Sequence, residues 1–142
     1  MKTQFQSHKG FTLIEVMVVV AILGLLAAMV VPNLIGRDEE ARINKAKQDI
    51  SSLENALDLY RLDNFAYPTT DQGLDALVKK PSGAPEAKRY KAGGYIKKLP
   101  TDPWGNAYQY IKPGSHGAVD VYSFGPDQTP SEDDIGNWNL DK

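Results

Sequence analysis

Residues 9–31 read KGFTLIEVMVVVAILGLLAAMVV, and this stretch decides how the rest of the chain is organised. Of the 21 residues from 11 to 31, all are apolar except Thr12, Glu15 and Gly24. As an α-helix, a segment of this length extends about 32 Å, which is enough to cross the hydrocarbon core of a bilayer. Residues 16–31 also lack the polar stripe of a soluble amphipathic helix. The sequence therefore predicts a membrane anchor.

Two alternatives for the apolar run are a fully buried core helix and a secretory signal peptide. A signal peptide ends in a small-residue A-x-A site, whereas this run ends AAMVVP at residues 27–32, with leucine at the third position before either alanine junction. We therefore favour a retained anchor. Lys2 and Lys9 precede the run, and the net acidic segment 37–40 follows it. Because basic flanks stay cytoplasmic, the N-terminus is expected inside and the rest of the chain outside.

Composition excludes several classes of protein. The chain has 142 residues, 16 basic and 18 acidic side chains, a formal charge of −2 and no cysteine. This length fits one ordinary domain, and the charge gives no basic footprint for nucleic acid. Without cysteine there can be no disulfide, thiolate zinc site, cysteine nucleophile or iron–sulfur cluster.

Glu15 is the anomaly within the apolar run. A carboxylate in a bilayer-embedded helix costs at least about 2.5 kcal/mol on insertion scales, so it needs a partner or a hydrated route to the interface. The string KGFTLIEV at residues 9–16 closely resembles the class III signal of type IV pilins and type II secretion pseudopilins. That signal is a short basic leader ending in glycine, followed by phenylalanine and by an acid at the fifth mature position.

The resemblance implies processing and assembly. Prepilin peptidase would cut between Gly10 and Phe11, methylate the new Phe11 amine, and leave the apolar run as anchor and filament core. Family precedent pairs that amine with the Glu15 carboxylate of an adjacent subunit. The expected parts are a leader at 1–10, a transmembrane and filament-core helix at 11–35, and a periplasmic head at 36–142.

The remainder predicts an α+β head. Ile43, Ala46, Ile50, Leu53, Leu57 and Tyr60 recur at helical spacing, which predicts an amphipathic helix to about residue 62. Three heptads are too few for a coiled-coil seam, so this stripe is expected to pack on its own domain. Pro32 predicts a kink or local melting near residues 28–36. The overall expectation is one long N-terminal helix, membrane-spanning in its first half and amphipathic in its second, packed on a small antiparallel sheet in a pilin-like fold.

Shorter elements are expected after the long helix. Thr69 with Gln72 forms a capping-box pattern that predicts a short helix to about Val78, and residues 80–94 are expected to form an irregular loop. Alternating apolar residues predict strands at 95–99, 107–111, 119–124 and 138–140.

The middle and end of the chain resemble the major pseudopilins of type II secretion systems. The similar segments are LDN at 62–64, YPTT at 67–70, GYI at 94–96, DPWG at 102–105 and DIGNW at 134–138. The resemblance implies a non-enzymatic filament subunit in the inner membrane of a Gram-negative bacterium, whose polymer exports folded periplasmic proteins through an outer-membrane secretin. The implied partners are further copies of the chain, minor pseudopilins, the prepilin peptidase and N-methyltransferase, a platform protein, an assembly ATPase, the secretin and membrane lipid.

A dense acidic cluster lies at Asp127, Glu132, Asp133 and Asp134. By sequence alone a solvated loop is favoured over a cation site, because no EF-hand spacing is present. The resemblance to the major pseudopilins implies structural calcium instead. The implied ligands are the side chains of Asp127, Asp133 and Asp134 and the carbonyls of Phe124 and of Thr129 or Ser131.

Other constellations do not indicate chemistry. His8 lies in the expected leader, and His116 lies in a PGSHG turn that lacks the G-x-S-x-G pattern, so a solvated histidine is expected there. Trp104, Tyr108 and Tyr110 are expected in the core rather than in a carbohydrate platform. Two alternatives stay open beside the pseudopilin: a type IV pilin for motility or adhesion, and a membrane-anchored lectin or hydrolase using the acidic loop.

Overall fold

The computed structural model describes residues 10–141, except for the side chains of residues 30–35. Lys2, His8, Lys9 and most of the expected leader lie outside the described residues. The chain divides into two compact units, Met1–Glu39 and Glu40–Lys142.

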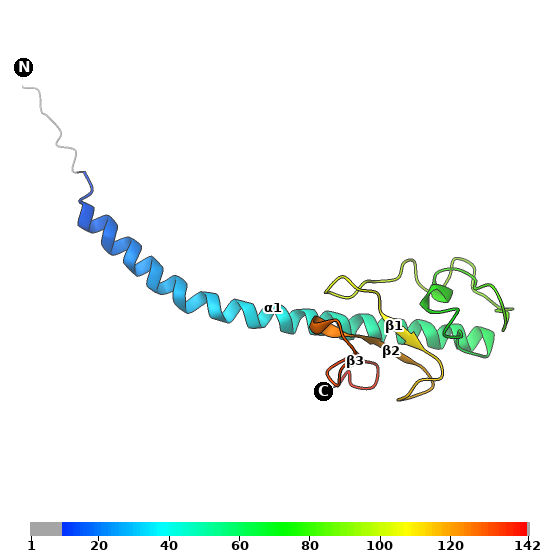
Figure 1. Ribbon diagram of the computed structural model, residues 1–142. Coiled ribbons are helices and arrows are strands. Elements are labelled where there is room, and N and C mark those ends of the chain that lie inside the picture. Colours follow the sequence, from blue (N-terminus) through cyan, green and yellow to red (C-terminus); the bar gives the residue numbers. More distant parts are fainter. Residues whose placement is uncertain (1–9, 142) are drawn as a thin grey trace, which may run out of the picture. The chain divides into compact units, whose positions relative to one another are not determined.

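Helix α1 (Leu13–Asn64) is 52 residues long and dominates the fold (Figure 1). It continues through Pro32 without interruption, so the predicted local melting near residues 28–36 is wrong. One proline removes a single backbone donor, a loss that the many remaining hydrogen bonds of so long a helix can tolerate. Within the described part of the chain, no helix meets the length and apolarity expected of a membrane span. The anchor at 11–35 therefore stays a prediction.

The second half of α1 carries the core of the head, as its spacing predicts. Five side chains of the predicted stripe are 0–2 % exposed: Ala46, Ile50, Leu53, Leu57 and Tyr60. They pack against the chain's own loops and strands, which confirms self-packing over a coiled-coil seam. The helix ends where Phe65 adopts a positive φ of 64°, two residues beyond the predicted end.

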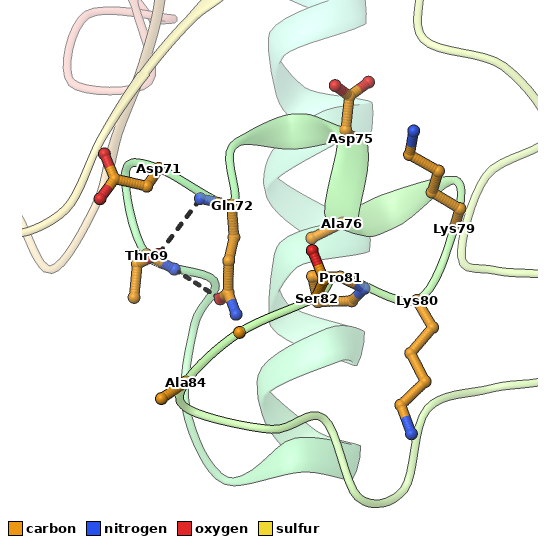
Figure 2. A pocket seen from close by; sticks show the side chains of 11 residues that line it. Thr69, Asp71, Gln72, Asp75, Ala76, Lys79, Lys80, Pro81, Ser82 and Ala84 are labelled. Atoms are coloured by element: carbon orange, nitrogen blue, oxygen red, sulfur yellow. Dashed lines mark hydrogen bonds between the residues drawn. The ribbon is translucent and has the colours of Figure 1, made fainter.

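The capping box that follows α1 is confirmed, and a short helix ends near Val78 as predicted, but it is a 3₁₀ helix that begins only at Leu74. The backbone N–H of Thr69 donates to Oε1 of Gln72 at 3.0 Å, and the N–H of Gln72 donates to Oγ1 of Thr69 at 3.1 Å (Figure 2). Gly73, at φ 59°, then redirects the chain before helical hydrogen bonding can propagate. Only the short 3₁₀ helix η1 (Leu74–Leu77) forms, and residues 80–94 are irregular as expected.

Three short strands form one antiparallel sheet beside α1 (Figure 1). They are β1 (Gln109–Ile111), β2 (Asp120–Ser123) and β3 (Ile135–Gly136), in the order β1-β2-β3. The 3₁₀ helix η2 (Gly125–Asp127) follows β2 directly. The predictions for 107–111 and 119–124 are therefore confirmed with shorter bounds.

The strands predicted at 95–99 and 138–140 are wrong. The backbone N–H groups of Tyr95 and Ile96 both donate to the carbonyl of Leu77, so this segment binds the end of η1 rather than a strand. Near the C-terminus the observed strand, β3, begins three residues before the predicted one. The chain turns after β3, and a Cβ on Gly136 would lie 2.3 Å from the Trp138 ring, so only glycine lets the indole fold back over the strand.

Two tyrosines join the sheet to the rest of the head. The Tyr108 hydroxyl donates to Oδ2 of Asp49 on α1 at 3.0 Å, and the Tyr110 hydroxyl donates to the Pro68 carbonyl at 2.8 Å. Both side chains lie in the core, as expected, and Trp104 packs against it while partly exposed.

These tyrosines predict unfolding in alkali. Burial, and for Tyr108 the hydrogen bond to Asp49, raises the pKa of both hydroxyls well above the ordinary value of about 10. Tyrosinate therefore forms more readily in the unfolded chain, so the free energy of unfolding should be unaffected below about pH 10 and fall as the pH rises above it. Circular dichroism followed against pH should show this, with a shallower fall for Tyr110→Phe. An equal slope in that variant would contradict the assignment.

Candidate functional site

The expected cleavage junction lies in an open segment. Gly10 precedes α1 in irregular backbone, and a Cβ at that position would meet nothing within 4 Å. The Phe11 side chain is 88 % exposed. The described part of the junction therefore leaves room for a peptidase, although cleavage itself stays a prediction.

Glu15 closes a capping box at the start of α1, which sequence reasoning missed. The Thr12 N–H donates to Oε2 of Glu15 at 3.0 Å, and the Glu15 N–H donates to Oγ1 of Thr12 at 3.3 Å. The signal was present in the sequence, since T-x-x-E before an apolar run is the capping-box pattern. The carboxylate thus has a donor within its own chain and stabilises the first turn of the helix.

The surroundings of Glu15 are otherwise apolar. A shallow cavity of about 390 Å³ is lined by Glu15, Ile14, Val18 and Val19 of α1 and by Phe11, which precedes the helix. Exposed apolar side chains continue along this segment as far as Met29, at 66 % exposure. So extended an apolar surface is typical of a segment that is covered by lipid or by other helices.

The acidic loop after β2 is held by its own hydroxyl residues. The Asp127 carboxylate accepts hydrogen bonds from the backbone N–H and hydroxyl of Thr129, at 3.3 and 3.1 Å. Oδ1 of Asp134 accepts equivalent bonds from Ser131, at 3.2 and 3.3 Å. A side-chain hydrogen bond from Ser131 also lowers the pKa of Asp133, which is fully exposed.

These carboxylates do not converge. Among residues 10–141, no group of three or more histidine or acidic side chains is placed to hold a metal ion. The oxygen-only donors are of the type that calcium prefers, but the hydrogen bonds to Thr129 and Ser131 occupy two of the three carboxylates. Calcium binding by this loop stays a prediction.

Asp102 organises the DPWGN loop from a buried position, a role that the sequence did not indicate. The residue is 4 % exposed. Its Oδ1 accepts hydrogen bonds from the N–H groups of Trp104 and Asn106, at 3.1 and 2.7 Å. Its Oδ2 accepts a 2.7 Å hydrogen bond from the hydroxyl of Ser123 on β2. One carboxylate therefore shapes the loop and fixes it to the sheet.

His116 is exposed in its turn, as expected, but it also has partners. Its Nδ1 lies 3.0 Å from Oδ2 of the buried Asp120, and its ring stacks on Trp138 at 3.9 Å between centroids. The N–H of Ser115 also donates to Oδ2 of Asp120, at 2.7 Å. Histidine and aspartate are adjacent, but no described hydrogen bond joins the hydroxyl of Ser115 to the His116 ring, so the pair is assigned to anchoring the turn to the sheet.

Asn137 joins the C-terminal segment to helix α1. Its Nδ2 donates to Oε1 of Glu54 on α1 and to the Val119 carbonyl, both at 3.1 Å. Its Oδ1 accepts a hydrogen bond from the Val121 N–H at 3.2 Å. The GNW segment thus has a structural role in binding β2 and α1 together.

A cavity of about 460 Å³ lies between η1 and the loop at residues 80–84 (Figure 2). It is lined by charges of both signs, including Asp71, Asp75, Lys79 and Lys80. The carboxylates of Asp71 and Asp75 point in different directions, and Lys80 pairs with Glu86 at 3.4 Å. This arrangement does not present the converging groups of a catalytic site.

Comparison with known proteins gives a consistent result. The family model described as type II secretion system, protein G, matches residues 33–138, and that of the prokaryotic N-terminal methylation motif matches residues 6–31. Type II secretion system core protein G of Aeromonas hydrophila is 60 % identical over 138 residues, covering 96 % of each chain. The protein of the same name from Escherichia coli K12 is 57 % identical over 95 % of this chain and 94 % of its own.

A solved structure is also similar. The crystal structure of the major pseudopilin from the type 2 secretion system of enterohaemorrhagic Escherichia coli matches with a TM-score of 0.72 and 53 % identity, covering 80 % of this chain and 96 % of that one. Its likeness confirms the α+β, pilin-like fold of a long helix on a small antiparallel sheet. On these matches, together with the methylation motif and the observed helix and sheet, the chain belongs to the protein G family of the type II secretion system.

Proposed function

We propose that this chain is the major structural subunit of a type II secretion pseudopilus. The observation that carries the proposal is family membership over the head together with an apolar helix that begins at the processing motif. Polymerisation from the inner membrane would drive folded periplasmic proteins through an outer-membrane secretin. The chain's own work is self-association, so it would not be an enzyme. Of the alternatives left by the sequence, a pilin or an anchored hydrolase has no comparable support.

The proposed topology follows from the flanking charges and the apolar run. Residues 1–10 would be a cytoplasmic leader, residues 11–35 the single-pass anchor and later filament core, and residues 36–142 a periplasmic head. Assembly would involve minor pseudopilins, the prepilin peptidase and N-methyltransferase, the platform protein, the ATPase and the secretin. The exposed apolar side chains of residues 11–29 suit both lipid and a helical bundle.

N-terminal processing tests this proposal directly. We expect mature protein extracted from the membranes of its native host to begin at Phe11 and to carry one methyl group on its amine. Intact mass and N-terminal sequencing would report both changes. A Gly10→Leu variant, which alters the residue before the cleaved bond, should keep Met1. A wild-type chain that also keeps Met1 would contradict the proposal.

Structural calcium in the loop after β2 belongs to the same proposal. The side chains of Asp127, Asp133 and Asp134 would bind the cation with the carbonyl of Phe124 and that of Thr129 or Ser131. Two carboxylates would exchange their present hydrogen bonds for the ion. Calcium would relieve repulsion between neighbouring carboxylates and fix the terminal loop in a chain that has no disulfide.

Chelation tests the calcium. We expect a calcium chelator to lower the thermal unfolding midpoint by about 5–10 °C, because a ligand that binds only the folded state stabilises it. Added calcium should restore the midpoint and magnesium should not. The matched control is Asp133→Asn, which should unfold near the chelated midpoint and be insensitive to chelator. Equal midpoints for the wild-type chain with and without chelator would remove calcium from the proposal.

A further inference from the structure

The head has opposite charge on two of its segments. Residues 79–98 contain seven basic side chains and one acidic one, whereas residues 119–141 contain six acidic side chains and no basic one. Within the unit Glu40–Lys142, the loops after the C-terminal end of α1 lie at one end of the head and the loop after β2 lies toward the other (Figure 1). Two surfaces of opposite charge on one molecule can attract each other only between copies.

The first surface is an exposed apolar and cationic projection, which we call the basic knob and define as Leu62, Phe65 and Arg89. Leu62 and Phe65 are 74 % and 78 % exposed. The Arg89 guanidinium lies over the Phe65 ring, 5.4 Å from its centroid. The backbone N–H of Arg89 also donates to Oδ1 of Asn64 at 3.2 Å, which fixes the loop that carries Arg89 to the end of α1.

The backbone at Phe65 supports a role for the knob. A φ of 64° is unfavourable for a bulky residue and costs on the order of 1–3 kcal/mol. The strained residue presents its ring to solvent instead of burying it. The left-handed conformation ends α1 and leaves the ring facing solvent, where it is available to a partner.

The second surface is a cavity of about 420 Å³, which we call the acidic aromatic pocket. Its lining includes Tyr122, Phe124, Pro130, Glu132, Asp134 and Trp138. The Tyr122 ring lies 5.5 Å from that of Phe124 and 5.7 Å from that of Trp138. The Asp134 carboxylate lines the pocket together with that of Glu132, which is not among the proposed calcium ligands, so the lining is acidic. Aromatic faces beside carboxylates suit a guanidinium and an apolar ring.

We propose that the basic knob of one copy binds the acidic aromatic pocket of a second copy and joins the heads end to end. This inference rests on the proposed function, since a filament needs two different surfaces that recognise each other and repeat without closing. The occupant is a second copy because both halves of the charge match are on the same chain. The contact would add a head-to-head interaction to the association of the apolar helices.

Charge reversal tests the contact. We expect Arg89→Glu and Glu132→Arg each to reduce polymer recovered by sedimentation roughly tenfold, since like charges would then face each other. The double variant, which restores opposite charges, should recover most of the polymer. Lys79→Glu is the matched control, because Lys79 is exposed in the same basic segment but outside the knob. Failure of the double variant to recover would overturn the pairing.

Cross-linking tests the geometry without charge changes. The chain contains no cysteine, so a Phe65→Cys, Glu132→Cys double variant has only the two introduced thiols. Mild oxidation of its polymer should give a ladder of covalent oligomers, and each single variant should give none beyond dimers. Wild-type polymer with no ladder from the double variant would overturn the end-to-end contact and leave the proposed function intact. A wild-type chain that forms no polymer would overturn both.

Discussion

Glu15→Ala is expected to abolish or severely reduce pseudopilus assembly while leaving leader cleavage intact. In the polymer, the Glu15 carboxylate would face the Phe11 amine of a neighbouring copy in a nearly dry helical bundle. Removing one partner of such a pair leaves an uncompensated charge and costs about 3–5 kcal/mol per contact. Repeated at every subunit, that loss should prevent polymer from accumulating. Electron microscopy of sheared filaments and immunoblotting for the processed chain would measure the two effects separately.

The capping box supplies the control that separates two roles of Glu15. Glutamine can close the same box with Thr12, because its side-chain oxygen can accept the Thr12 N–H in place of Oε2 of Glu15. Glu15→Gln therefore keeps the start of α1 but removes the charge. If the charge pair drives assembly, Glu15→Gln should fail as Glu15→Ala does. Normal filaments from Glu15→Gln would instead assign Glu15 to helix capping alone.

Hydrophobic periodicity was sufficient to predict the buried face of α1 in the head, because residues on one face of a helix recur at a fixed spacing. Ile50, Leu53 and Leu57 are each at most 1 % exposed, as their spacing predicts. The capping box at Thr69 was also local, since its two hydrogen bonds join residues three apart. Such features depend on neighbours in the sequence and can be predicted from it.

The misplaced strands depend on contacts that spacing does not encode. Tyr95 alternates like a strand residue, but its N–H finds an acceptor at Leu77 and its hydroxyl donates to Asp63 at 2.9 Å. Trp138 lies over Gly136, so the strand precedes it instead of containing it. Edge strands of two or three residues contribute few hydrogen bonds, and side-chain packing decides where they begin.

The candidate site divides in the same way. The processing motif and Glu15 are contiguous, so the resemblance to pseudopilins located them without a structure. The sequence did not predict the hydrogen bonds of the acidic loop. Thr129 or Ser131 was expected to contribute a carbonyl, but both residues donate hydrogen bonds from their hydroxyl and backbone N–H groups. The roles of Asp102 and Asp120 depend on strand β2. Asp120 belongs to this strand, whereas Asp102 lies well before it in the sequence and contacts it through Ser123.

Asp102→Ala is expected to destabilise the head strongly. It removes a buried carboxylate that accepts hydrogen bonds from the Trp104 and Asn106 N–H groups and from the Ser123 hydroxyl. The Ser123 hydroxyl is buried and the two loop N–H groups are half-buried. Donors left without acceptors in such places cost about 1–3 kcal/mol each, so the free energy of unfolding should fall by about 3 kcal/mol. Urea denaturation of the detergent-solubilised chain, followed by tryptophan fluorescence, would measure the loss.

Two variants make that measurement specific to the buried carboxylate. Asp71→Ala removes an exposed carboxylate and should change the free energy of unfolding by no more than about 0.5 kcal/mol. Asp102→Asn keeps one carbonyl oxygen and should lie between the two, because its amide can accept the loop N–H groups at one oxygen but presents a donor to Ser123. Since the Asp102 carboxylate fixes the DPWGN loop to β2, its loss should loosen the loop and sheet together in one unfolding transition. If Asp102→Ala were as stable as Asp71→Ala, the loop would be held by Trp104 packing, and the buried carboxylate would have no structural role.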